Sequence, residues 1–284
     1  MVRFFGILIG LFFAGMLVYS FGRGAVEYIS NPPVKAVEYQ FHEKPKDLSF
    51  ASDGPFGKFD NQQLQRGFQV YKEVCAACHG IRLVAFRNLA ELGYTEDEVK
   101  AIAANWPIET PSIDPATGEA STRPSIPADK FPKPFANDVA AGAANNNAIP
   151  PDLSLITKAR QGGAPYIYSL LTGYSDPPAE LPEANRPGTG LHYNAYFANL
   201  NIAMAPPITG DDQVTYSDGT KSTVSQMAQD VSAFLIWTAE PSLVKQKQTG
   251  WAVLAFLLIA TILAFLSYKT IWADVKAEKK KKEA

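Results

Sequence analysis

Residues 64–79 have the sequence LQRGFQVYKEVCAACH, in which two cysteines three positions apart are followed at once by a histidine. The pattern Cys75-x-x-Cys78-His79 is the attachment signature of a c-type haem. Its spacing suits that chemistry because two thiols can add to the vinyl groups on one porphyrin edge, while the next residue reaches the iron from the same face. Imidazole is the usual proximal ligand of haem iron. The motif therefore predicts one covalent haem c, attached through Cys75 and Cys78 and ligated by His79.

Two other chemistries share the Cys-x-x-Cys spacing, a dithiol redox pair and half of a zinc site. Zinc needs two further ligands, and the remaining histidines, His42 and His192, have no spacing that completes a site. A thiol oxidoreductase is expected to have a strand before the motif, whereas a helical pattern precedes it. Only two cysteines occur in 284 residues, which excludes a disulfide-stapled scaffold. The haem interpretation is therefore favoured.

Helical signals dominate the part of the chain around the motif. Asp60 is a good N-cap with Gln63 at its third position, and apolar residues then recur at a spacing of 3.6 as far as Cys75. Further helices are predicted after the capping box of residues 95–98, from a first position at Pro165 to residue 172, and from Thr223 to a break at Pro241. Residues 107–151 are rich in loops and proline, and no strand pattern is found. The prediction is a mainly α, class I-like c-type cytochrome domain with long loop insertions.

The sixth iron ligand decides whether such a haem transfers electrons or binds oxygen and peroxide. Met204 lies in the segment IAMAPPI, a non-helical loop that two prolines stiffen so that it can hold a thioether at fixed reach. A thioether prefers ferrous iron and raises the reduction potential relative to two histidines. On this chemistry Met204 is favoured, His192 is an alternative, and a site without a second protein ligand stays open.

Two uncharged hydrophobic segments lie near the chain ends. Residues 248–268 are 21 residues without a charge, enough helix to cross a hydrocarbon core of roughly 30 Å. They predict a C-terminal transmembrane helix, with Trp251, Tyr268 and Trp272 near the interfaces. Residues 1–24 are either a signal peptide, cleaved near residues 20–22, or a second anchor, and the sequence does not decide between the two.

Basic residues gather at the two ends of the chain. Arg3 and the six lysines after residue 268 lie at the ends. Between residues 4 and 247 the chain has 19 of its 26 Lys and Arg residues and 25 of its 28 Asp and Glu residues, a net charge of −6. Basic flanks stay on the cytoplasmic side, which predicts a haem domain of residues 25–245 on the periplasmic side of a bacterial inner membrane and a cytoplasmic tail of residues 269–284. The acidic body argues against a nucleic-acid partner.

Sequence blocks beyond the haem motif resemble the cytochrome c1 family, the haem subunits of the cytochrome bc1 complex. The blocks follow the family order from about residue 54 to the C-terminal anchor: Gly54–Gly57, Leu64–His79, Arg82–Val84, Phe131–Phe135, Ala143–Asn146, Pro150–Ser154, Leu171–Tyr174, Asn201–Ile208, Asp218–Thr220 and Asp230–Pro241. Many proteins share the haem motif, whereas this ordered set is specific.

The resemblance implies an electron-transfer subunit of ubiquinol:cytochrome c oxidoreductase that performs no bond chemistry of its own. Electrons would pass from the Rieske iron–sulfur protein to a cytochrome c, in a dimeric complex that also contains cytochrome b. The resemblance places Met204 at the sixth-ligand position and Arg123 roughly where an arginine pairs a haem propionate. It also identifies residues 145–153 as a loop of the haem pocket.

Four positions depart from the family pattern: Gly80, Ile81, Lys130 and Asn147. None is an iron ligand, so the departures concern the fine geometry of the pocket. Acidic clusters at residues 96–98 and at Glu180 with Glu183 would suit electrostatic steering of a basic cytochrome. The rival hypotheses are a membrane-tethered cytochrome c that serves a terminal oxidase and a haem peroxidase with an exchangeable sixth ligand.

Overall fold

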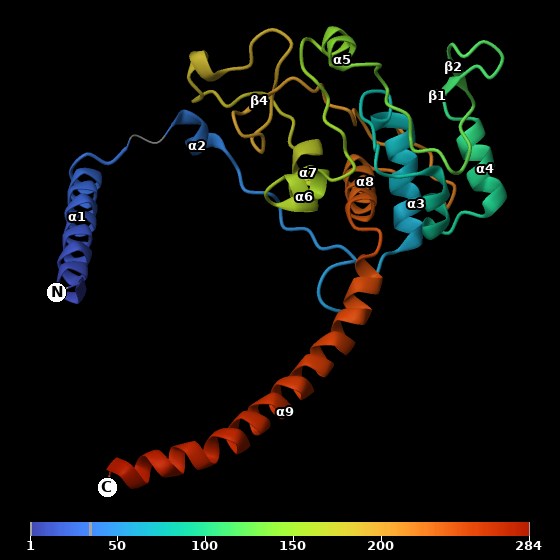
Figure 1. Cartoon of the computed structure of the whole chain (residues 1–284). Helices are drawn as coiled ribbons and strands as arrows, with labels where there is room; N and C mark the ends of the chain where they lie inside the picture. The colour runs from blue at the N-terminus through green and yellow to red at the C-terminus, as the bar shows by residue number, and fades with distance from the viewer. Residues whose placement is uncertain (1, 34–35, 284) are drawn as a thin grey trace.

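A long helix lies at each end of the chain, with a helical, loop-rich domain between them (Figure 1). The computed structural model describes residues 2–33 and 36–283. Helix α1 (Val2–Ser30) leads through the short α2 (Val37–Phe41) into the domain, and α9 (Leu243–Glu283) leaves it. The prediction of a mainly α fold with a C-terminal apolar helix is confirmed.

The domain consists of helices, two short hairpins and long loops. Its helices are α3 (Asn61–Val70), α4 (Glu96–Ala104), α5 (Asp138–Ala144), α6 (Ile156–Ala159), α7 (Gly163–Leu171) and α8 (Val224–Ala239), with a π turn at Tyr71–Cys75 and 3₁₀ segments at Phe86–Leu92 and Glu183–Asn185. Strand β1 (Thr110–Ile113) pairs antiparallel with β2 (Ala120–Arg123), and β3 (His192–Tyr193) with β4 (Asn201–Ile202). The sequence shows no strand pattern because strands of two to four residues are too short for a recognisable alternation.

Most of the helix boundaries follow the caps in the sequence. The Asp60 side chain accepts bonds from the backbone of Gln62 and Gln63, and Thr95 and Glu98 form the predicted capping box. Helix α8 begins after its predicted cap, Thr223. Helix α7 differs from the prediction: it begins at Gly163, so Pro165 is its third residue rather than its first. Proline is tolerated throughout a first turn because those N–H groups have no partner within the helix.

The core lies where α3 crosses α8 (Figure 1). A Cβ on Gly67 would lie only 2.1 Å from the Asp230 carbonyl oxygen, so only glycine lets the two backbones approach this closely. An aromatic cluster surrounds the crossing, with ring centroids 4.1 to 6.5 Å apart; it includes Phe68, Tyr71, Phe86, Trp106, Phe131 and Phe234. Ring pairs at these distances add to the stabilisation from burial.

A charged network crosses the same interface. Asp230 on α8 is fully buried, and its carboxylate accepts bonds from Arg66 Nε at 2.9 Å, Gln226 Nε2 at 2.8 Å and Gln63 Nε2 at 3.2 Å. Arg66 Nη1 also contacts Asp218 at 2.7 Å. The buried carboxylate therefore has an ionic partner and several donors, which offsets the cost of removing it from water.

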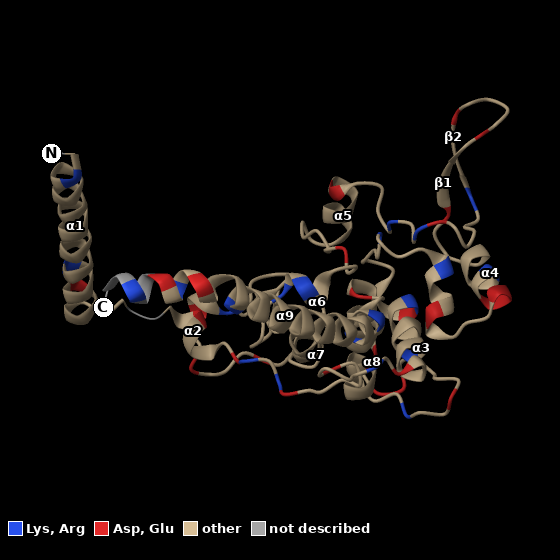
Figure 2. Ribbon diagram, turned by 60° about the horizontal axis from the view of Figure 1, so that its bottom comes forward, with Lys and Arg blue, Asp and Glu red and all other residues tan. Residues whose placement is uncertain are grey.

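Helices α1 and α9 are each long and apolar enough to cross a membrane, judged by length and composition, and the domain buries no part of their most apolar windows. Residues 248–268 lie within α9, whose charged residues lie toward its two ends (Figure 2). Helix α1 continues through residues 20–22, the predicted cleavage site, and residue 1 lies outside the described residues. The choice between signal peptide and anchor stays a prediction, as does the division of the chain into domains.

Replacement of Asp230 by alanine is expected to lower the free energy of unfolding by about 3–5 kcal/mol, because Arg66 and two glutamine amides lose a buried partner. Urea unfolding of the full chain in detergent, followed by circular dichroism, measures this. The matched control is Lys100→Ala, which removes the exposed contacts of Lys100 to Glu96 and Asp97 and should leave the unfolding midpoint unchanged. Equal effects of the two substitutions would contradict a special role for the buried network.

Candidate haem site

One turn of the chain presents both thiols and the imidazole. Helix α3 widens into the π turn, in which the Ala76 N–H donates to the Tyr71 carbonyl at 2.8 Å. The N–H groups of Cys78 and His79 then both donate to the Cys75 carbonyl, at 3.1 and 2.9 Å. Cys75 and Cys78 are free and half-buried. The sequence did not predict the π turn, a feature often found at functional sites.

His79 is held in the form that can ligate a metal. Its Nδ1 lies 2.8 Å from the Pro151 carbonyl oxygen. A carbonyl can only accept, so Nδ1 carries the proton and the Nε2 lone pair is free. Burial lowers the pKa of the imidazole, although the Pro151 bond and the charge of Asp152 oppose this. The ring is therefore neutral at pH 7, as iron ligation requires.

The segment Pro150–Ser154 is fixed against the motif by hydrogen bonds. The Leu153 N–H donates to the Gly80 carbonyl at 2.8 Å, and the Asp152 carboxylate accepts from the N–H groups of Arg82 at 2.9 Å and Ser154 at 3.0 Å. These bonds hold the Pro151 carbonyl within hydrogen-bond distance of His79 Nδ1. The structure thus places this part of the predicted pocket loop, residues 145–153, beside the motif.

Three of the four departures from the family pattern have a local explanation. Asn147 has φ of 61°, in the left-handed region that glycine and asparagine tolerate best. A Cβ on Gly80 would lie 3.3 Å from Asp152 Oδ2, so a larger residue there would press on the loop. Ile81 is fully buried in the core. Lys130 is exposed, and nothing in the structure explains the lysine.

The surroundings of the thiols do not favour a dithiol redox pair. Burial, together with the neighbouring Cys78, raises the pKa of the Cys75 thiol to about 12. A redox dithiol needs a lowered pKa, since the thiolate is the reactive form. The zinc alternative also lacks support, because within the described ranges the two cysteines belong to no group of three or more His, Cys, Asp or Glu that could hold a metal ion.

A hollow of about 240 Å³ adjoins Cys78. Its walls combine apolar and proline side chains, such as Phe135, Ile149 and Pro150, with the charged side chains of Arg82, Lys133, Asp138 and Asp152. The donor set fits a haem, because two free thiols and an imidazole with a free Nε2 lie on one turn of the chain.

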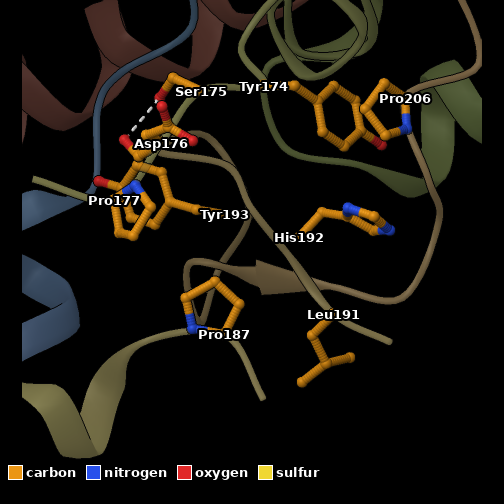
Figure 3. Close-up of a pocket in the computed structure, with 9 residues that line it drawn as sticks. All are labelled: Tyr174, Ser175, Asp176, Pro177, Pro187, Leu191, His192, Tyr193 and Pro206. Atoms are coloured by element: carbon orange, nitrogen blue, oxygen red, sulfur yellow. Dashed lines mark hydrogen bonds between the residues drawn. The ribbon is translucent and has the colours of Figure 1, made fainter. Parts of the chain in front are cut away.

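Met204 follows β4 in a loop that Tyr174 holds. The Tyr174 hydroxyl donates to the Met204 carbonyl at 3.0 Å, and burial raises the pKa of Tyr174 well above its usual range, so the hydroxyl remains a donor. Figure 3 shows Tyr174, His192 and Pro206 around a hollow of about 510 Å³ beside this loop. His192 pairs in register with Ile202, two residues before Met204. Both candidates for the sixth ligand therefore lie in one small region.

The Arg123 guanidinium forms an ion pair with the Asp129 carboxylate. Its Nη1 and Nη2 lie 2.6 and 2.8 Å from the two carboxylate oxygens of Asp129, and Nη1 also donates to the Pro124 carbonyl at 3.0 Å. The Asp129 carbonyl in turn accepts from the Phe86 N–H at 3.0 Å. The structure thus ties Arg123 to Asp129 in the loop after β2, and through Asp129 to the start of the 3₁₀ segment. The role of Arg123 toward a haem propionate stays a prediction.

The resemblance identified residues 145–153 as a pocket loop, but the sequence did not predict which groups orient the candidate ligands. Pro151 acts through a backbone carbonyl, and Asp152 and Tyr174 act through long-range hydrogen bonds. Pro151 and Asp152 lie in a block that resembles the family, as does Tyr174, and that was the only available signal for them.

Comparison with known proteins places the chain in one family. The model of the Cytochrome C1 family matches residues 50–275. Cytochrome c1 of Rhodospirillum rubrum is 50% identical over 235 residues, which cover 78% of this chain and 85% of that protein. The mitochondrial cytochrome c1 heme protein of Saccharomyces cerevisiae is 44% identical over 245 residues, 86% of this chain and 76% of that protein. Cytochrome b/c1 of Bradyrhizobium diazoefficiens is 43% identical over 253 residues, 82% of this chain but 36% of that longer protein.

Replacement of Arg123 by glutamine is expected to lower the free energy of unfolding at neutral pH, because the ion pair with Asp129 is lost. The haem potential should stay unchanged, because both terminal nitrogens of Arg123 are already bound by Asp129. The hydrogen bond from Arg123 lowers the pKa of Asp129 in the folded state. Such a carboxylate stabilises the fold above its unfolded pKa of about 4 and loses this contribution as the pH falls through its lower folded pKa.

The difference in unfolding midpoint between wild type and Arg123→Gln should therefore be present at pH 7 and shrink below about pH 4. Unfolding curves across this range and a redox titration measure the two effects. A lowered haem potential with unchanged stability would instead support the propionate role.

Proposed function

The chain belongs to the cytochrome c1 family, the haem-carrying redox subunits of the cytochrome bc1 complex, and we propose that it passes electrons from the Rieske iron–sulfur protein to a cytochrome c within ubiquinol:cytochrome c oxidoreductase. The observation that carries the proposal is the His79–Pro151 bond, which presents a neutral imidazole beside two free thiols. This arrangement suits a fixed electron carrier, because a ligand held in one tautomer and orientation needs little reorganisation when the metal changes charge.

One haem c is bound, in this proposal, through thioethers at Cys75 and Cys78. The haem supplies a one-electron couple. His79 Nε2 and the Met204 sulfur would hold its iron. Pro151 would fix the histidine ring, and Tyr174 would fix the methionine loop. A thioether ligand acts to raise the potential.

Arg123 is not included among the proposed haem contacts, because Asp129 binds both of its terminal nitrogens.

Cytochrome b is the proposed membrane partner. The Bradyrhizobium relative is named cytochrome b/c1, and this chain matches only 36% of its length, so a larger protein carries a region similar to this chain. The Rieske protein as electron donor, the cytochrome c acceptor and a dimeric complex complete the proposed assembly.

Helix α9 is the proposed anchor in a bacterial inner membrane. Its uncharged stretch and exposed apolar surface support this, and the basic residues after residue 268 favour a cytoplasmic tail. The haem domain, residues 25–245, then lies on the periplasmic side. Residues 1–24 form either a second anchor or a signal peptide.

The acidic balance of the domain supports docking of a basic acceptor through long-range steering. The acidic cluster at residues 96–98 contributes less to this steering than its formal charge suggests. Lys100 lies 2.9 Å from Glu96 and 3.4 Å from Asp97, and Glu98 caps α4. Glu180 and Glu183 are both exposed, so their region is the better candidate of the two.

Purification of the chain in mild detergent tests the assignment to the complex. Co-purifying b-type haems and a Rieske EPR signal are expected, together with a haem that stays with the denatured chain on a gel. Oxidase spectra in place of these signals would assign the chain to a terminal oxidase. Loss of the haem on denaturation would contradict thioether attachment.

Replacement of Met204 by leucine is expected to lower the haem potential by a substantial part of the roughly 0.8 V range that axial ligands control, and to let carbon monoxide bind to the ferrous protein. The reason is that leucine offers no lone pair and leaves one iron position open. Redox titration and optical spectra measure both effects.

Met227→Leu is the matched control for this substitution. Met227 is fully buried in α8, so the same change of side chain there should leave the potential and the carbon monoxide spectrum as in the wild type. An unaltered potential in Met204→Leu would rule out the thioether ligand and direct attention to His192. Ready carbon monoxide binding by the wild type would favour a peroxidase.

A further inference from the structure

The loop of residues 50–58 contacts the base of α9 at two points. The Phe56 ring stacks on Trp251, with centroids 5.3 Å apart and ring planes 12° from parallel. The Lys247 ammonium donates a hydrogen bond to the Ser52 carbonyl. A segment almost 200 positions before α9 is thus held beside the start of the helix.

Hydrogen bonds close the loop, although its tip is exposed. The Phe50 N–H donates to the Asp53 carboxylate at 2.7 Å, and the Lys58 N–H closes the loop on the Ala51 carbonyl at 2.9 Å. Gly57 has no room for a side chain, because a Cβ there would lie 2.0 Å from the Asp53 carbonyl oxygen. Phe56 is nevertheless 77% exposed at the end of this fixed turn. The exposed ring lies against Trp251 of α9, in the helix that is apolar enough to cross a membrane.

The depth of Phe56 relative to a membrane follows from its contact with Trp251. The uncharged stretch of α9, residues 248–268, is about 31 Å long as a helix, close to the thickness of a hydrocarbon core. Trp251 lies three residues, about 4.5 Å, inside the end of this stretch. Since the Phe56 ring is stacked on Trp251, it lies at nearly the same depth, where aromatic side chains are favoured.

The charges near this contact also fit a phospholipid surface. Lys245 precedes the uncharged stretch by about one turn and Lys58 ends the loop, and both are exposed, whereas the Lys247 ammonium is bound to the Ser52 carbonyl. Lysines at this level can extend to phosphate groups while their stems lie along apolar surface. Asp53 is the one acidic residue in the loop, and its carboxylate is bound to the Phe50 N–H.

We propose that the loop of residues 50–58 forms a second membrane contact of the haem domain, with Phe56 at the boundary between headgroups and acyl chains of the bilayer that α9 spans. A single helix leaves a domain free to tilt about one point, whereas a helix and a loop together fix its tilt. The inference rests on the membrane-spanning role of α9 in the proposed function.

Spin labelling of the holoprotein in phosphatidylcholine–phosphatidylglycerol nanodiscs tests the contact. Cys75 and Cys78 are consumed by the haem in the proposed holoprotein, so a cysteine introduced by Pro55→Cys is the single free thiol and leaves Phe56 in place. The measured quantity is the ratio of collision rates with oxygen and with a polar nickel chelate. Ile113→Cys, at an exposed site on β1, is the aqueous control, and Leu258→Cys, within the apolar run of α9, is the membrane control.

The ratio at position 55 is expected to be several-fold above that at position 113 and below that at position 258. Adding Phe56→Ser should return it toward the aqueous value, with the haem spectrum unchanged as a check of folding. Equal ratios at positions 55 and 113, with position 258 in lipid, would overturn the loop contact and leave the anchor intact. An aqueous ratio at position 258 would overturn both the contact and the proposed anchor.

The same Pro55→Cys label in the assembled complex separates lipid from protein as the partner. An oxygen-rich ratio like that in nanodiscs supports the lipid contact. Loss of collisions with both reagents would show that another subunit covers the loop, and would overturn the proposal.

Discussion

The close crossing of α3 and α8 at Gly67 constrains the whole molecule, because α3 leads through the π turn into the haem motif and α8 leads into α9. A residue with a side chain at position 67 would force the two backbones apart, since the Asp230 carbonyl occupies that space. The buried Asp230 carboxylate and the aromatic cluster then fix the angle and register of the crossing. The position of the Cys75–His79 motif relative to the proposed anchor depends on this crossing.

Around that crossing, the candidate site consists of two loops that the helices do not position by themselves. The first is held to the motif by bonds between residues 80–83 and residues 152–154, and it brings the Pro151 carbonyl to His79. The second carries Met204 and is held by Tyr174, which follows α7. Each proposed iron ligand is thus oriented by a residue distant in sequence, as expected for a carrier whose geometry should change little between oxidation states.

The loop of residues 50–58 is the proposed second contact between the domain and the membrane. It precedes α3 directly, contacts the first turns of α9, and so connects both ends of the α3–α8–α9 unit. A haem domain held at two points has a defined tilt relative to the bilayer, and the distance from its haem to a membrane partner is then defined as well. Electron transfer between fixed subunits benefits from such a constraint, whereas a domain on one flexible tether would sample many distances.

The sequence by itself determined the mainly α class, the apolar C-terminal helix, the caps of α3, α4 and α8, and the residue types of a haem motif, because each depends on neighbours within one or two turns. It did not determine the π turn at Tyr71–Cys75, the hairpins, the start of α7 or the engagement of Arg123 by Asp129. The π turn, the hairpins and the start of α7 depend on tertiary packing. The engagement of Arg123 depends on a loop that brings its side chain and that of Asp129 together. The tertiary structure alone decided the tautomer of His79, since that depends on the Pro151 carbonyl, a backbone group present in every residue and therefore invisible in the sequence.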